Sequence, residues 1–201
     1  MLHIIIRVLI TFVIAIPYHL LCRKKNLSKS GKVALSVSAV GVCLVLWALP
    51  FENVFFTFDS PQAVFDYYKG GTVVDSADHN ASGALIFEKD SNTHSVFFVQ
   101  KKEDGYKMCP NYKVEKIANA KYESVHFFVY QIKGTNDYYL QVWGVVSEEV
   151  TLTDSENNVF DLKYEDHSSK KTLVAIEPIN YDEGYCCYLN GDRVVFASNM
   201  N

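Results

Sequence analysis

Two long apolar segments near the start of the chain limit its possible folds more than any other feature. The first runs from Leu2 to Leu21 and holds one charged residue, Arg7, while the second runs from Val33 to Pro50 and holds none. A helix needs about 20 apolar residues to cross the hydrocarbon core of a bilayer, and main-chain groups in lipid must pair within their own segment. The pattern therefore predicts a transmembrane helical hairpin, with spans at about 2–21 and 33–50 and a connecting loop at 22–32.

Arg7 makes the first span the weaker of the two predictions. An arginine at the centre of a membrane helix costs roughly 2.5–3.5 kcal/mol, but Arg7 lies near one end, from which its long side chain can reach the headgroups. The alternative is a first segment that lies in the membrane interface, yet it lacks the charged face that such helices carry. A cleaved signal peptide is disfavoured because residues 17–22 offer no small-residue cleavage site.

The loop between the spans sets the expected orientation. Its basic residues, unaccompanied by any acid, are typical of a cytoplasmic loop; they are Arg23, Lys24, Lys25, Lys29 and Lys32. The same residues would also suit contact with anionic lipid headgroups. Residues 1–51 carry a charge of +6 and residues 52–201 carry −10, because every Asp and Glu lies at or beyond Glu52. We therefore expect a plasma-membrane protein with both termini and residues 52–201 extracytoplasmic.

A short helix is predicted directly after the hairpin, at about 61–69. Ser60 suits the N-cap, Pro61 suits the first helical position, and the glycine pair at 70–71 can end the helix. Three apolar side chains between these signals fall on one face at helical spacing: Val64, Phe65 and Tyr68. We expect this face to pack on a sheet.

The remainder alternates strand-like runs with turn residues, which predicts a mainly antiparallel, sandwich-like β domain. We expect a mixed subdomain over 52–117, which holds the short helix, and a sandwich-like subdomain over 122–201. Asn190-Gly191 is the dipeptide of a tight type I′ turn, and residues 134–137 resemble a hairpin loop. The expected strands are 72–75, 83–89, 94–101, 105–108, 112–117, 122–133, 138–147, 149–153, 158–164, 171–177, 184–189 and 193–198.

No sequence motif for catalysis or for a cofactor is present. There is no Gly-x-Ser-x-Gly and no glycine-rich phosphate loop. Pairs of acids at 75/78 and 154/156 lack the dense alternation of acids and glycine of a calcium loop, and Asp78-His79 is favoured as a solvated loop pair. The other histidines of the domain are far apart in sequence: His94, His126 and His167. We expect no cofactor and no metal, and enzymatic activity is disfavoured.

Three cysteines of the domain, Cys109, Cys186 and Cys187, offer a possible disulfide. Adjacent residues on a strand point to opposite faces, so Cys186 and Cys187 are not both expected to face the core. One of them would pair with Cys109 and close a loop of about 77 residues, which is worth about 3–4 kcal/mol. Buried free thiols are the alternative and the favoured one.

One stretch carries a family resemblance. Ser60-Pro61-Gln62-Ala63-Val64-Phe65-Asp66-Tyr67-Tyr68 resembles the Ser-Pro-x-x-Ala-Phe-x-Tyr-Tyr stretch of small, uncharacterised, membrane-anchored proteins of low-GC Gram-positive bacteria. It differs at Val64, where that stretch has Ala. The resemblance implies a bacterial cell-surface setting and brings no activity with it.

These features together favour a membrane-anchored, extracytoplasmic binding or sensing module without enzymatic activity. Its expected partners are the lipid bilayer and another membrane or cell-surface protein, with a sheet edge or loop tip as the natural binding surface. Nucleic acid is disfavoured because the domain carries −10 and the basic cluster adjoins the membrane. The alternatives are a cell-envelope hydrolase whose site assembles from distant residues, and an accessory subunit of a membrane complex.

Overall fold

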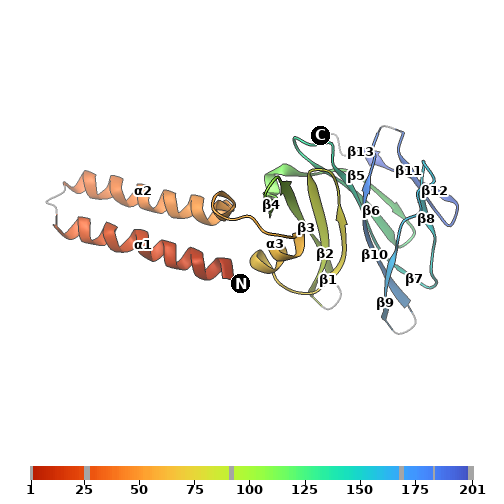
Figure 1. Cartoon of the computed structure of the whole chain (residues 1–201), viewed down its shortest axis with the longest axis horizontal. Helices are drawn as coiled ribbons and strands as arrows, with labels where there is room; N and C mark the ends of the chain where they lie inside the picture. Colours follow the sequence, from red (N-terminus) through yellow and green to blue (C-terminus); the bar gives the residue numbers. More distant parts are fainter. Residues whose placement is uncertain (1, 25–27, 91–92, 168–169, 183, 199–201) are drawn as a thin grey trace.

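The computed structural model describes residues 2–24, 28–90, 93–167, 170–182 and 184–198. Two antiparallel helices, α1 (Leu2–Lys24) and α2 (Lys29–Ala48), form a hairpin that projects from one end of a β domain (Figure 1). Both are long and apolar enough to cross a membrane, over His3–Arg23 and Lys29–Ala48, and neither is buried within the protein. Two apolar N-terminal helices are thus confirmed, and they are compatible with a membrane anchor.

The β domain is layered, and its layers follow one another outward from the hairpin in Figure 1. The helix α3 comes first, followed by a small sheet, a large sheet and an outer sheet. The strand orders are β1-β2-β3-β4 in the small sheet, β13-β5-β6-β7-β10-β9 in the large sheet and β12-β11-β8 in the outer sheet. All the described strand pairs are antiparallel, as the sequence predicts.

The strand bounds are as follows. The small sheet comprises β1 (Val73–Asp78), β2 (Ser82–Asp90), β3 (Thr93–Lys102) and β4 (Gly105–Met108). The large sheet comprises β5 (Val114–Tyr122), β6 (Val125–Ile132), β7 (Tyr138–Val146), β9 (Lys163–His167), β10 (Lys170–Ile179) and β13 (Ala197–Ser198). The outer sheet comprises β8 (Leu152–Asp154), β11 (Cys186–Leu189) and β12 (Asp192–Val195).

The helix α3 (Pro61–Tyr68) confirms the short helix predicted from local signals. The Ser60 hydroxyl accepts a hydrogen bond from the Ala63 N–H at 3.1 Å, and Pro61 occupies the first turn. Gly70, with φ +68°, takes the left-handed conformation just beyond the helix. The predicted apolar face is buried against the small sheet; it consists of Val64, Phe65 and Tyr68.

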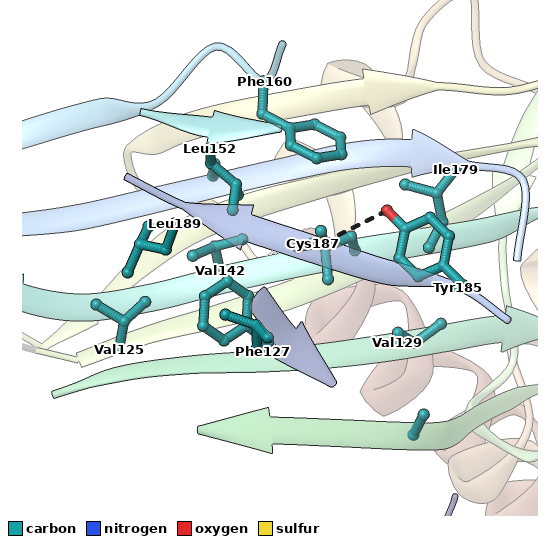
Figure 2. Packing of buried hydrophobic residues seen from close by; sticks show 14 of the residues in the cluster. Val125, Phe127, Val129, Val142, Leu152, Phe160, Ile179, Tyr185, Cys187 and Leu189 are labelled. Atoms are coloured by element: carbon teal, nitrogen blue, oxygen red, sulfur yellow. Dashed lines mark hydrogen bonds between the residues drawn. The ribbon is translucent and has the colours of Figure 1, made fainter. Parts of the chain in front are cut away.

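Three apolar cores separate the four layers. One lies between α3 and the small sheet and contains Phe65 and Leu85, and a second lies between the small and large sheets and contains Phe98 and Tyr139. Figure 2 shows the third, between the large and outer sheets, with side chains of β6 and β7 pointing toward those of β8 and β11. Because strand side chains alternate in direction, β3 and β6 each contribute to the cores on both of their faces.

Some predicted strands differ from the observed ones. The strand expected at 112–117 begins at Val114 and continues to Tyr122 in the large sheet, so β5 runs across the gap between the two expected subdomains. The strand expected at 158–164 is wrong for most of its length, since β9 begins at Lys163 and Val159 forms only an isolated bridge with Thr153. Between the strands expected at 83–89 and 94–101, residues 91–92 lie outside the described residues.

Turn chemistry was predicted more accurately. Asn190 and Gly191 have φ of +52° and +88° and connect β11 to β12, as a type I′ turn requires. Residues 133–137 connect β6 to β7 at the loop predicted over 134–137. The turn before β4 places Gly105 at φ +132°, where an added Cβ would lie 2.5 Å from the carbonyl oxygen of Phe58.

The segment that links the hairpin to the β domain covers one edge of the small sheet. It contains a 3-10 turn, Phe51–Val54, and then runs alongside β4. The Asn53 side chain bonds to both main-chain groups of Met108, and the main chain of Phe58 bonds to that of Tyr106 in both directions. The outer edge of β4 is therefore capped by the protein's own chain.

Candidate functional site

The β domain contains a groove of about 1010 Å³ beside the second core. One side of the groove comes from β3 and the end of β4, and the other from β6 and β7 of the large sheet. Its volume lies at the upper end of the range for ligand sites. Its lining includes His94, Cys109, Phe128, Tyr130, Gln141 and Trp143.

The large sheet gives the groove an aromatic floor. The rings of His126 and Phe128 stack with centroids 6.3 Å apart, and the His126 ring also contacts Trp143 at 5.6 Å. The Tyr130 hydroxyl donates a hydrogen bond to Gln141 Oε1 at 3.1 Å. These residues occupy alternate positions of β6 and β7, so their side chains share one face of the sheet.

Among the described residues, three buried polar atoms at the groove have no hydrogen-bond partner. They are the indole nitrogen of Trp143 and both ring nitrogens of His94. The His94 side chain is only 2% exposed, and its Nε2 lies 3.2 Å from Glu165 Oε2 without hydrogen-bond alignment. An unsatisfied buried polar group costs about 1–3 kcal/mol, so the groove holds polar groups that a bound molecule can satisfy.

Cys109 lines the groove but is a poor nucleophile. Its side chain is 2% exposed, and burial raises the pKa of the thiol to about 11. Reactive cysteines have lowered pKa values, because the thiolate is the nucleophile. The groove therefore holds a structural thiol rather than an activated one.

The cysteines are free thiols throughout the structure. Cys109 belongs to the core between the small and large sheets, whereas Cys187 belongs to the core on the other face of the large sheet. The considered disulfide from Cys109 to Cys186 or Cys187 is therefore not formed. Cys186 and Cys187 are both buried, but they do not both face a core, as expected: Cys187 belongs to the core between the large and outer sheets, while Cys186 lies beside Tyr188 and Arg193.

Figure 2 places Cys187 against Tyr185, to whose hydroxyl oxygen the thiol donates over 3.7 Å. Burial raises the pKa of the Cys187 thiol to about 12 and also raises the pKa of the Tyr185 hydroxyl. Both groups therefore remain protonated near neutral pH.

His79 lies at the opposite end of β2 from His94 and belongs to a structural network. Asp137, 2% exposed, accepts hydrogen bonds from the Ser82 hydroxyl at 2.6 Å and from the Ala81 N–H at 2.9 Å. His79 Nδ1 lies 3.0 Å from the other oxygen of Asp137. The network ties the loop between β1 and β2 to the loop before β7. Of the expected solvated pair, Asp78 is exposed at the end of β1, whereas His79 is held in this network.

The acids considered for calcium act locally in the same way. Asp154 accepts hydrogen bonds from the main chain of Glu156 and from both nitrogens of Asn158, which closes its own turn. Asp75 accepts from the N–H groups of Ser76 and Ile176 and so joins β1 to β10. No group of three or more possible metal ligands occurs among the described residues. The side chain of His167 lies outside them.

A charged contact joins the hairpin to the β domain. Arg7 forms a two-pronged salt bridge with Glu52, with N–O distances of 2.8 and 2.9 Å, and its side chain is 11% exposed while that of Glu52 is fully buried. Arg7 also donates to the carbonyl oxygens of Trp47 and Leu49 at the end of α2. Arg7 was expected to reach toward the lipid headgroups, but its guanidinium instead binds Glu52, which lies 45 residues further along the chain.

The basic residues of the loop lie at the far end of the hairpin from the β domain. Arg23, Lys29 and Lys32 are exposed there. Lys25 and the side chain of Lys24 lie outside the described residues. This arrangement is compatible with the expected contact with lipid headgroups, which stays a prediction.

Comparisons with protein families, with curated proteins and with solved structures found nothing that matches this chain. The resemblance of residues 60–68 to membrane-anchored proteins of Gram-positive bacteria stays a prediction.

Sequence reasoning named His94 and Cys109 but missed the rest of the groove. A usable signal was present, because polar and aromatic residues alternate with apolar ones along 126–130 and 139–143. Their alternation predicts one shared face, but only the fold reveals that the small sheet leaves part of that face uncovered.

Proposed function

We propose that this protein is a membrane-anchored binding module whose β domain lies outside the cytoplasm and binds its ligand in the groove. Two apolar helices with a basic connecting loop support the anchor and its orientation. The observation that carries the binding role is the groove itself, in which the His94 ring nitrogens and the Trp143 indole are buried without hydrogen-bond partners.

The groove supports binding better than catalysis. Its thiol, Cys109, has a raised pKa and is buried, which is the opposite of activation. His94 and His79 each contact one carboxylate, at opposite ends of β2, and do not form a joint acid–base site. Aromatic faces with a few converging polar groups are typical of ligand recognition.

The orientation is tested by labelling of introduced cysteines in intact cells. Ser147→Cys adds an exposed thiol to the β domain, and Ser30→Cys adds one to the basic loop. Both variants also carry Cys22→Ser and Cys43→Ser, because these native cysteines are only half-buried, whereas Cys109, Cys186 and Cys187 are buried and give little background. A membrane-impermeant maleimide should label position 147 in intact cells and position 30 only after permeabilisation; the reverse pattern would refute the proposed orientation.

The groove is tested by the fluorescence of Trp143, which becomes the sole tryptophan of the full chain after Trp47→Phe. The protein in lipid nanodiscs is titrated with three kinds of probe: short peptides, oligosaccharides and phospholipid vesicles. At least one kind should shift the Trp143 emission saturably, and Val96→Phe, which narrows the groove, should abolish that shift. The matched control, Val195→Phe on an exposed position of β12, should leave it unchanged.

If no probe alters the Trp143 emission, or if Val96→Phe and Val195→Phe respond alike, the groove is not the binding site and the proposal fails.

A further inference from the structure

The strand β3 extends well beyond its neighbour β4. The two strands are paired from Lys102, opposite Gly105, to Val99, opposite Met108. One further hydrogen bond joins the Cys109 N–H to the Phe98 carbonyl at 3.0 Å. After that point the chain leaves the sheet and starts β5 in the other layer. The first half of β3 therefore has β2 on one side and none of the described strands on the other.

The main-chain groups on this open edge follow from the period of a strand. The Phe98 carbonyl points toward the β4 side, so the N–H and C=O groups of Val96 and His94 point the same way. Phe97 and Ser95 are directed toward β2, where they are paired with Leu85 and Phe87. Within the described part of the chain, no main-chain hydrogen bond is found on this edge beyond Phe98.

The groove lies along this same edge. Its lining runs from Cys109 at the end of β4 to Gly70 and Glu88 beside the start of β3, with Phe128, Tyr130 and Trp143 as the floor. The five residues from His94 to Phe98 span about 17 Å at 3.3 Å per residue. A strand-length segment placed there would continue the line of β4 with its side chains alternately on and away from the aromatic floor.

The rest of the edge is closed by the protein itself. Asn53 and Phe58 occupy the outer main-chain groups of β4, which is how natural sheets prevent unwanted pairing. The chain thus leaves an edge unpaired where an aromatic groove borders it. This contrast distinguishes a site for a strand from an edge that is merely unprotected.

We infer that the ligand of the groove is an extended polypeptide segment that adds as a strand to β3 at His94–Phe98. This inference rests on the proposed binding function. Main-chain hydrogen bonds to Val96 and His94 give affinity, and pockets for alternate side chains give specificity. Residues that face the floor are apolar or aromatic, to match Phe128, Tyr130 and Trp143. The Trp143 indole and the His94 ring meet carbonyl or hydroxyl oxygens of the same segment.

The inference is tested on the full chain carrying Trp47→Phe in nanodiscs, with eight-residue peptides in which Val, Phe or Tyr alternates with Thr. These peptides should shift the Trp143 emission saturably. N-methylation at alternate residues removes the N–H groups of one edge of the peptide, so one methylation register should weaken binding by at least about tenfold, while the other register, whose N–H groups face away, should not. Hydrogen exchange of residues 93–98 should slow on binding.

The outcomes separate the two proposals. If oligosaccharides or lipid vesicles shift the Trp143 emission and peptides do not, the groove binds ligand but strand addition is wrong. Strand addition is also wrong if both methylation registers bind equally, or if exchange at 93–98 is unchanged by a bound peptide. If no probe of any kind binds, the proposed function itself fails.

Discussion

Removal of the Arg7 side chain should destabilise the whole protein far more than a surface substitution. In Arg7→Ala, the fully buried Glu52 carboxylate loses both of its guanidinium contacts and keeps only the Tyr68 hydroxyl at 3.5 Å. Breaking a buried ion pair by removal of one partner costs about 3–5 kcal/mol. The carbonyl oxygens of Trp47 and Leu49 also lose a donor, which adds to the cost at the end of α2.

The assay is thermal unfolding of the full chain in detergent micelles, followed by near-ultraviolet circular dichroism. For a domain of this size 1 kcal/mol corresponds to about 2–4 °C, so Arg7→Ala should lower Tm by roughly 6–20 °C. Glu52→Ala should cost less, because the Arg7 side chain is partly exposed and keeps its two carbonyl partners.

The double variant Arg7→Met/Glu52→Leu is the decisive control. Replacing both charges by apolar groups of similar size removes the unpaired charge, and such replacements are often neutral. It should therefore recover most of the stability that Arg7→Ala loses. Arg7→Ala with a wild-type Tm, or a double variant as unstable as Arg7→Ala, would refute the reasoning.

Three further predictions concern the β domain. Gly105→Ala should destabilise the protein by at least about 2 kcal/mol in a denaturant titration, because the φ of +132° is strained for alanine and the added Cβ meets the Phe58 carbonyl. Gly134→Ala is the matched control and should cost about 1 kcal/mol, because its φ is +81° but the space around it is open. Equal losses of stability in the two variants would contradict the role of Phe58. Burial raises the pKa of Cys109 to about 11 and that of Cys187 to about 12. At pH 8 both thiols should therefore react with a maleimide about a hundredfold more slowly than a free cysteine until the protein is unfolded. Rapid labelling of either residue in the native protein would argue against its burial. Burial raises the pKa of Glu177 in the folded state, so the folded protein holds this proton more tightly than the unfolded chain, and the contribution of Glu177 to stability falls as pH rises above about 4. Glu177→Gln, which can still accept a hydrogen bond from the Asp161 N–H, should raise Tm at pH 7 but not at pH 4. If the variant leaves the pH dependence of Tm unchanged, Glu177 is not its cause.

Local signals predicted the parts of the fold that local physics determines. The Ser60 cap, Pro61 and the apolar face of α3 lie within one short segment, and the Asn190-Gly191 turn needs only two residues. The length of the apolar segments likewise predicted two helices. In each case the deciding interactions join residues that are close in sequence.

The interactions that define the groove and the junction are long-range, so sequence could not supply them. Arg7 meets Glu52 across 45 residues, and Asp137 meets Ser82 across 55. The open edge of β3 exists because β4 is short, and nothing in residues 93–98 alone indicates an absent neighbour. The strand predicted at 158–164 failed because Asp154 draws Asn158 into a turn.

The contacts at the amino end of α1 determine how the β domain can move on its anchor. The covalent connection is the segment of residues 49–60, which is itself held to β4 through Asn53 and Phe58. Arg7 of α1 holds Glu52 of this segment, and His3 meets the Tyr67 carbonyl of α3 at 3.1 Å, so α1 is attached to the β domain at a second place and rotation is restrained. If the hairpin lies in the bilayer and the groove binds a ligand, as proposed, the groove keeps one orientation relative to the helices, and a force on the bound molecule is transmitted to the bilayer as torque.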